Sequence, residues 1–173
     1  IFKRDSDAVM GVYPVDHLIL GDSKFKKIIN NAKKMVEKKS ALITIGIKPT
    51  YPATGYGYIQ YDSNKKMVIQ GVYKVKTFAE KPEKETAEKF INSGEFLWNA
   101  GMFVWKAEII LLQMKTFMCK LHDSLDAIYE SLNTTQYNTV LDREWDLIKP
   151  ESIDYGVLVK AKNVYSIEAD FQW

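Results

Sequence analysis

ALITIGI, residues Ala41–Ile47, is a continuous apolar run with the length of one buried β-strand. Before it, Asp22 to Val36 repeats apolar side chains at spacings of three and four. That spacing predicts an amphipathic helix capped by Asp22, and the intervening lysines predict a solvated opposite face. Another short apolar run, Ala8–Tyr13, precedes the helix. Strand, helix and strand within about forty residues predict a parallel unit with a right-handed crossover, and hence an α/β fold.

The rest of the chain extends this plan with further strands and helices. We expect a mostly parallel sheet with some antiparallel additions, because strands and helices alternate along most of the chain. Strands are predicted at Tyr56–Asp62, Val72–Pro82, 101–105 and 164–170, with a turn at 63–66. Helices are predicted at about Glu83–Asn92, stopped by Gly94, at 107–118, at 122–132, and after a capping Ser152.

Composition limits the classes of partner. The chain has 173 residues, the length of about one domain, and its net charge of +2 comes from 24 basic and 22 acidic residues. So small an excess does not favour nucleic acid or a membrane surface, and no apolar run approaches the ~20 residues that cross a bilayer. Cys119 is the only cysteine, so no intrachain disulfide can form, and we expect a cytoplasmic protein with this side chain buried on a helix.

The ends of the chain predict that it is part of something larger. It opens on a short polar segment that leads directly into a strand, and it stops at Trp173, directly after another. We therefore expect a portion of a larger domain.

Polar residues and glycines near strand ends are the first candidates for chemistry, because ligands of open α/β sheets bind at the carboxyl ends of the strands. Asp16 and His17 follow the first strand, where a carboxylate can bind Mg²⁺; alternatively, Asp16 caps a turn and His17 bonds backbone. Gly55 and Gly57 would let a ligand approach the backbone closely, or form a plain turn.

Two more candidates lie further along. Glu80 and Lys81 end a strand, and could bind sugar hydroxyls and a phosphate or form an exposed ion pair of little value. Asn99 lies inside the apolar stretch Glu95–Trp105, directly before Ala100 and Gly101. Its carboxamide needs partners if buried: either it bonds neighbouring backbone, or it faces a cleft walled by Trp98 and Phe103, in which the two small residues leave room for a ligand.

These places occur together, and in the same order, in one family. The sequence resembles the bacterial mannose-1-phosphate guanylyltransferases of the sugar-phosphate nucleotidyltransferase superfamily. The matching stretches are PVDHLI (14–19), ITIGIKPTYPATGYGYI (43–59), FAEKP (78–82), FLWNAGMFVW (96–105) and SIDYGVLVK (152–160). The resemblance implies a Rossmann-like, GT-A-like nucleotidyltransferase fold. Residues 1–173 would be the central and C-terminal, sugar-binding portion of the catalytic domain.

The resemblance also implies a reaction and a set of roles. The family transfers GMP from GTP to mannose 1-phosphate and forms GDP-mannose and pyrophosphate. Here Asp16 would bind Mg²⁺ and, with Lys81, act in catalysis. Gly55 and Gly57 would line the sugar pocket through their backbone. Glu80 and Asn99 would hydrogen-bond mannose hydroxyls, and Lys81 would meet the sugar phosphate. The expected partners are GTP and mannose 1-phosphate, with a homo-oligomer left open.

Departures from the family pattern lead to further expectations. The Gly-rich strand-loop unit of the GGxGTRLWPLSR type, which holds the triphosphate, has no counterpart here, and the family's second metal-binding aspartate would come just after Trp173. Val159 replaces a residue of a usual Glu-Lys pair. We therefore expect this chain alone to be inactive. The alternatives are a related pyrophosphorylase with another sugar or base, and a non-catalytic sugar-phosphate-binding module.

Overall fold

The computed structural model describes residues 1–62 and 69–173. The chain divides into two compact units, Ile1–Ile109 with Lys162–Trp173, and Ile110–Ala161, which are described separately. The turn expected at 63–66 falls outside the described residues. No helix in the described ranges combines the length and the apolar character that a bilayer crossing requires.

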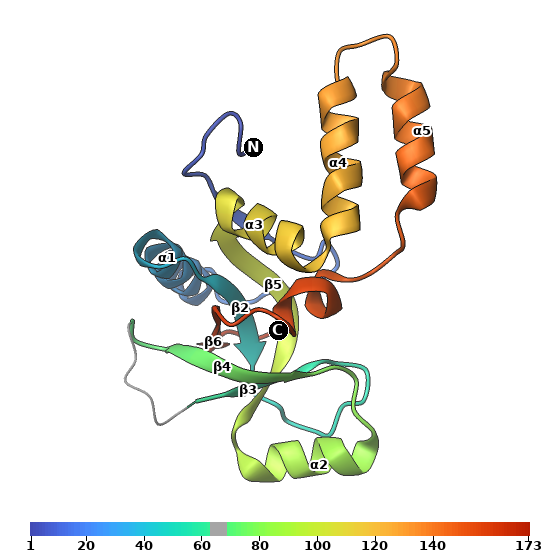
Figure 1. The fold of residues 1–173 in the computed structure, drawn as a ribbon. Coiled ribbons are helices and arrows are strands. Elements are labelled where there is room, and N and C mark those ends of the chain that lie inside the picture. The colour runs from blue at the N-terminus through green and yellow to red at the C-terminus, as the bar shows by residue number, and fades with distance from the viewer. Residues whose placement is uncertain (63–68) are drawn as a thin grey trace. The chain divides into compact units, whose positions relative to one another are not determined.

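The first unit contains a mixed sheet with helices beside it (Figure 1). Its strands are β1 (Val9–Val12), β2 (Leu42–Ile47), β3 (Tyr58–Tyr61), β4 (Val72–Ala79), β5 (Phe96–Lys106) and β6 (Val164–Ala169). Its helices are α1 (Asp22–Lys38) and α2 (Lys84–Ser93), and α3 (Ala107–Phe117) begins here and continues into the second unit.

The strand directions correct one prediction. Neighbours follow the order β1-β5-β2-β6-β4-β3, with an additional β5–β3 pairing. Only β2 and β6 pair in parallel among the described strands, so the expected mostly parallel sheet is wrong. The first two strands do run in the same direction, as the strand-helix-strand pattern predicted. However, β5 lies between them and pairs antiparallel with both, and an apolar run carries no information about which distant strand it will join.

A bulge in β5 separates two segments of this strand that pair with different neighbours. Thr44 pairs with Phe103 and Gly46 pairs with Asn99, so one residue of β2 faces three residues of β5. Gly101 lies inside the bulge with φ +64°, a left-handed conformation that glycine adopts at little cost. After the bulge β5 pairs with β1, and before it with β3.

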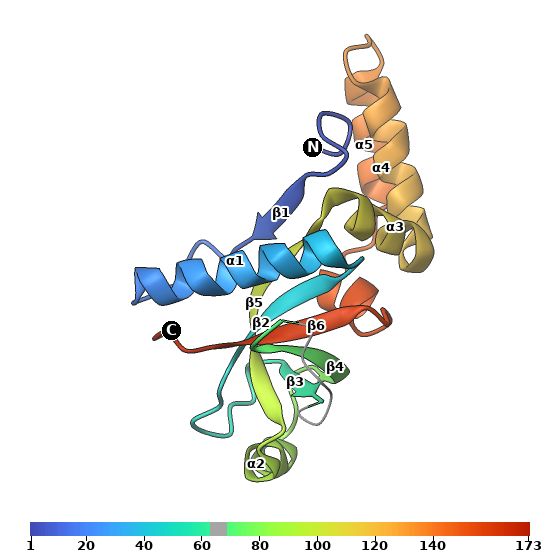
Figure 2. The same cartoon turned by 90° about the vertical axis from the view of Figure 1, so that its left-hand side faces the viewer.

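The main core forms where α1 lies along the sheet (Figure 2). The buried residues of α1 occupy the predicted spacing, and the lysines of the opposite face are exposed, as expected. Asp22 is the first residue of the helix rather than its cap, a position taken by Gly21 at φ 107°. The α1 residues Ile28, Ala32, Met35 and Val36 share this core with Ile43, Ile45, Met102, Val104 and Ile167.

A smaller core lies at the N-terminal end of β5. Tyr58, Trp98, Ala53 and the α2 residue Ala87 are buried together there. Helix α2 ends at Gly94, whose φ of 68° gives the left-handed C-cap that the sequence predicted. This packing fixes the ends of β3 and β5, where the candidate site residues lie.

The second unit is helical. Helices α4 (Cys119–Ser131) and α5 (Tyr137–Leu147) form a hairpin, followed by the π-helix η1 (Asp154–Leu158). The backbone N–H of Tyr155 donates to Ser152 Oγ at 3.4 Å, but the N-cap position of η1 is Ile153, one residue after the predicted cap. Cys119 is exposed at the start of α4, so the expectation of a buried thiol is wrong.

Candidate functional site

The strand registers bring four positions into one row. Tyr58 pairs with Ala79 on β4 and with Trp98 on β5. One residue before Tyr58, the same registers set Gly57 opposite both Glu80 and Asn99, and Asn99 pairs in turn with Gly46. Opposite residues of antiparallel strands carry their side chains on the same face of the sheet. The row Gly46, Asn99, Gly57 and Glu80 is therefore a single surface built from segments far apart in the sequence.

Glu80 and Asn99 both lie beside Gly57. A methyl group at Gly57 would lie 2.6 Å from Glu80 Oε2 and 3.6 Å from Asn99 Cβ. The Asn99 N–H also donates to the Gly57 carbonyl at 2.8 Å. Glycine at position 57 thus leaves space for the Glu80 carboxylate. Any residue with a Cβ atom would occupy that space.

Asn99 uses its side-chain carbonyl within the protein. Oδ1 accepts the Thr44 hydroxyl at 2.9 Å and the Gly101 N–H at 3.2 Å, and Thr44 is fully buried. Because a backbone N–H can only donate, the atom facing it must be the oxygen, which fixes the orientation of the carboxamide. The first interpretation of Asn99, bonding to neighbouring backbone, is confirmed for this oxygen. The bulge that Asn99 stabilises requires a left-handed backbone at position 101, which explains the glycine there.

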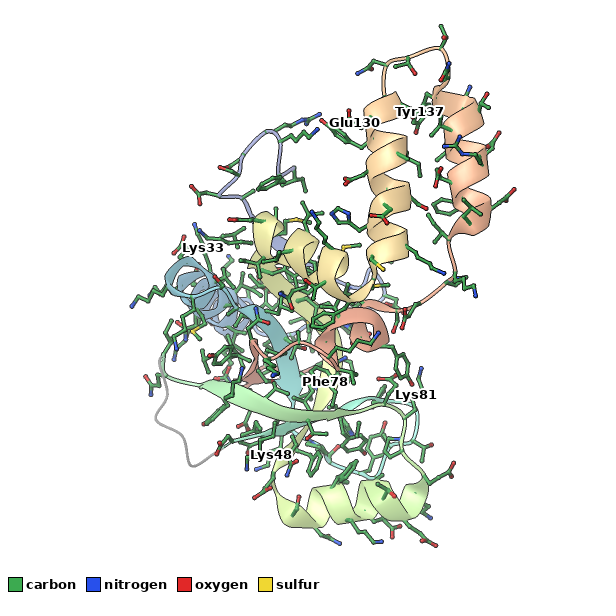
Figure 3. All side chains as sticks on the ribbon, viewed as in Figure 1. Lys33, Lys48, Phe78, Lys81, Glu130 and Tyr137 are labelled. Atoms are coloured by element: carbon green, nitrogen blue, oxygen red, sulfur yellow. The ribbon has the colours of Figure 1, made fainter. Side chains whose placement is uncertain are left out.

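Lys81 completes the cluster from the exit of β4 (Figure 3). Its Nζ lies 3.3 Å from Glu80 Oε1, and its side chain is 63% exposed. The Lys81 backbone has φ 41°, which is uncommon for a residue with a side chain. An exposed ammonium beside a less exposed carboxylate can turn toward an incoming anion at little cost.

Asp16 lies in the segment that follows β1. Its side chain is exposed, and it makes no hydrogen bond or ion pair within the described ranges. Likewise, no three His, Cys, Asp or Glu side chains gather into a metal-binding group in the described part of the chain. One accessible carboxylate still suits Mg²⁺, which commonly takes one or two protein carboxylates and completes its shell with water and substrate phosphates.

A row of aromatic rings connects the Asp16 segment to the glycine loop. His17 contacts Trp173, Trp173 contacts Tyr56, and Tyr56 contacts Trp98, which also contacts Tyr51. A hydrogen bond with Tyr51, together with burial, raises the pKa of Tyr56, so its hydroxyl stays protonated in neutral solution. Because Tyr56 lies between Gly55 and Gly57, the row of rings reaches the glycine loop itself.

The structure thus gathers most of the predicted site residues and leaves others outside. Gly57, Glu80, Lys81 and Asn99 lie together, and Gly55 is in the adjoining loop with open space around it. Phe103 stacks on Trp105 rather than beside Trp98. A cavity of about 560 Å³ lies elsewhere, within the helical unit, and is lined mainly by apolar side chains such as Phe117, Leu121 and Leu147.

Thr44 and Trp173 have structural roles in this site that the sequence did not reveal. Thr44 sits inside an apolar strand without a local sign of its partner, and Trp173 is the last residue. Their partners, Asn99 and His17, are distant in sequence, so only the tertiary fold brings these pairs together.

Comparison with known proteins identifies the family of this chain. The profile of the family described as nucleotidyl transferase matches residues 1–148. The chain belongs to the nucleotidyl transferase family. Among curated members, a xanthan biosynthesis protein of Xanthomonas campestris is 34% identical over 99% of this chain and 36% of its own length. A mannose-1-phosphate guanylyltransferase of Escherichia coli is also 34% identical, over 98% of this chain and 37% of that protein.

The fold of this nucleotidyl transferase chain also matches a solved structure. The crystal structure of mannose-1-phosphate geranyltransferase from Thermus thermophilus aligns with a TM-score of 0.85 and 24% identity, over 99% of this chain and 48% of that one. At that identity the likeness concerns the fold. The chain spans about a third of the length of the curated relatives it matches.

Proposed function

We propose that residues 1–173 form the sugar-phosphate-binding part of a mannose-1-phosphate guanylyltransferase. In the whole protein, GMP would pass from GTP to mannose 1-phosphate, giving GDP-mannose and pyrophosphate. The observation that carries the proposal is the convergence of Glu80, Lys81 and Asn99 around Gly57. Relatives named mannose-1-phosphate guanylyltransferase at 32–34% identity support the choice of sugar and base.

The cluster has the chemistry that a sugar phosphate needs. The Glu80 carboxylate can accept hydrogen bonds from sugar hydroxyls, and such bonds to a charged acceptor are about twice as strong as neutral ones. Lys81 offers a mobile ammonium for the phosphate, and the bare backbone at Gly57 allows the sugar to come close. Asn99, whose oxygen is held by Thr44 and Gly101, presents its amide group in a fixed direction.

The proposed reaction needs no side-chain nucleophile. A phosphate oxygen of mannose 1-phosphate attacks the α-phosphorus of GTP, a new P–O bond forms, and the bond to the leaving pyrophosphate breaks. Asp16 would hold Mg²⁺, which when bound offsets the repulsion between the two anionic substrates. Lys81 would bind and orient the sugar phosphate, and orientation supplies a large part of such catalysis.

Calorimetric titration of the protein with mannose 1-phosphate tests the proposal. We expect Glu80→Gln and Lys81→Met each to weaken binding roughly tenfold or more, since each removes a charged hydrogen-bonding group. Glu88→Gln and Lys84→Met on the exposed surface of α2 are matched controls that should bind like the wild type.

Two outcomes of this titration would redirect or end the proposal. Tighter binding of glucose 1-phosphate than of mannose 1-phosphate would favour a related pyrophosphorylase. Equal binding by wild type and Glu80→Gln would contradict the proposed sugar contact. Because the chain spans about a third of its relatives' length, we expect it alone to bind sugar phosphate with little turnover of GTP.

A further inference from the structure

Trp173 is hydrogen-bonded to the segment that carries Asp16. Its indole Nε1 donates to His17 Nδ1 at 3.0 Å, and the two rings meet edge to face with centroids 5.1 Å apart. The backbones alongside are paired as well: Leu20 N–H donates to the Gln172 carbonyl at 3.0 Å, and Gln172 N–H donates back at 3.2 Å. Residues 172–173, which follow β6, and residues 17–20 are therefore joined through both side chains and backbone.

The same indole also touches the glycine loop. The Trp173 and Tyr56 rings lie 5.4 Å apart at an angle of 62°, and Tyr56 is flanked by Gly55 and Gly57. Trp173 thus stands between the segment with Asp16 and the loop that borders Glu80. The indole contacts both segments, so it is a physical bridge between them.

The hydrogen bond also fixes how His17 is turned. An indole N–H can only donate, so His17 Nδ1 is the accepting atom and this side of the ring faces Trp173. This holds the imidazole in one orientation. Asp16, its neighbour in the chain, has no partner of its own within the described ranges. The direction of the Asp16 carboxylate therefore depends on how firmly the adjoining backbone is held.

We propose that Trp173 is a positioning residue: through His17 and Tyr56 it holds the Asp16 carboxylate in place relative to the sugar-phosphate pocket. The proposal rests on the proposed function for the role of Asp16, but the bridge itself does not. The affinity of a metal site depends strongly on where its carboxylates are held. Outer-shell groups that orient ligands typically change metal affinity by about 10- to 100-fold.

Amide hydrogen exchange at Leu20 and Gln172 tests the bridge without any ligand. Trp173→Phe keeps a ring against Tyr56 but removes the N–H donor, and His17→Leu removes the acceptor. Each should speed exchange at these two amides and leave the β2 amides unchanged. The variant His17→Asn supplies an acceptor near the Nδ1 position, so both amides should again be protected from exchange, unlike in His17→Leu. Trp145→Phe, at a position of α5 with 67% exposure, is the matched control.

The effect of Mg²⁺ on mannose 1-phosphate binding tests the positioning role. In the wild type, Mg²⁺ should tighten binding, and Asp16→Asn should remove that enhancement. Trp173→Phe should reduce the enhancement roughly tenfold or more, with binding in the absence of Mg²⁺ unchanged, and His17→Asn should retain it. Because both act through one bond, the double variant Trp173→Phe with His17→Leu should lose little more than either single variant.

The outcomes separate the two proposals. Unchanged exchange at Leu20 and Gln172 in Trp173→Phe overturns the bridge, whatever the ligand data show. Faster exchange with a wild-type Mg²⁺ enhancement in that variant overturns the positioning role. Faster exchange in a protein whose wild type binds no mannose 1-phosphate leaves the bridge standing and contradicts the proposed function.

Discussion

Gly55 and Gly57 are two residues apart in one loop, but their surroundings differ. A methyl group at Gly55 would meet nothing within 4 Å, whereas one at Gly57 would come within 2.6 Å of Glu80 Oε2. The sequence assigned both glycines the same role in the pocket. The structure distinguishes them, because only Gly57 lies in the row with Asn99 and Glu80.

Gly57→Ala should therefore impair binding more than folding. The nearest atom is the end of a flexible glutamate side chain, which can move aside, so the free energy of unfolding should change by less than about 1 kcal/mol. The Glu80 carboxylate would be displaced, and mannose 1-phosphate binding should weaken roughly tenfold. Gly55→Ala is the paired control and should alter neither quantity. Calorimetric titration and urea unfolding of both variants measure this, and equal effects of the two substitutions would refute the distinction.

Asn99 has a structural role that can be separated from ligand binding. Asn99→Ala removes the acceptor of both the buried Thr44 hydroxyl and the Gly101 N–H, so we expect a loss of about 1–3 kcal/mol in the free energy of unfolding. Thr44→Val removes only one donor and should cost less. The double variant should cost less than the sum, because the hydroxyl left unpaired in Asn99→Ala is then absent. Urea denaturation measures all three, and strictly additive losses would show that the two side chains are not coupled.

At the scale of elements, the α4–α5 hairpin contains a titratable contact. Glu144 on α5 is buried, and Arg143 Nη2 donates to its Oε1 at 2.7 Å. Hydrogen bonds from Arg143 and from the Ser124 hydroxyl on α4 lower the pKa of Glu144 below its ordinary value of 4.5. Since the folded pKa is below the unfolded one, this contribution to stability is present above pH 4.5 and is lost as the pH falls through the folded value.

Glu144→Gln should therefore reduce the acid sensitivity of the protein. We expect the wild type to lose thermal stability more steeply than the variant as the pH is lowered past 4.5, with the two curves converging in acid. Glu108→Gln, at an exposed position of α3, is the matched control and should follow the wild type. Circular dichroism melting curves across this range give the comparison. Parallel curves for wild type and Glu144→Gln would mean that the contact does not stabilise the folded state.

The helices could be predicted from the sequence better than the strand pairing. Periodicity placed α1, and glycine chemistry placed the end of α2 at Gly94, because both signals are local. The direction of β5 could not be read in this way, since its partners β1, β2 and β3 come from elsewhere in the chain. Asn99 presented two alternatives for the same reason: its Thr44 partner lies 55 residues away.

At the scale of the whole molecule, family motifs predicted a set of site residues, and the sheet explains why Glu80 and Asn99 meet at Gly57. Antiparallel registers on both sides of β3 bring the exit of β4 and the first part of β5 to Gly57. A mostly parallel sheet would not have predicted that meeting. The bridge from Trp173 to His17 had no local signal at all, because it joins positions 156 residues apart.

The central claim is that Glu80, Lys81 and Asn99 enclose one sugar-phosphate site around Gly57. A crystal structure of the protein with mannose 1-phosphate tests it most directly. We predict density for the sugar over Gly57, with hydroxyls within hydrogen-bonding distance of the Glu80 carboxylate and the phosphate beside Lys81. Mannose 1-phosphate bound elsewhere, with Glu80 and Lys81 still paired only to each other, would contradict the account.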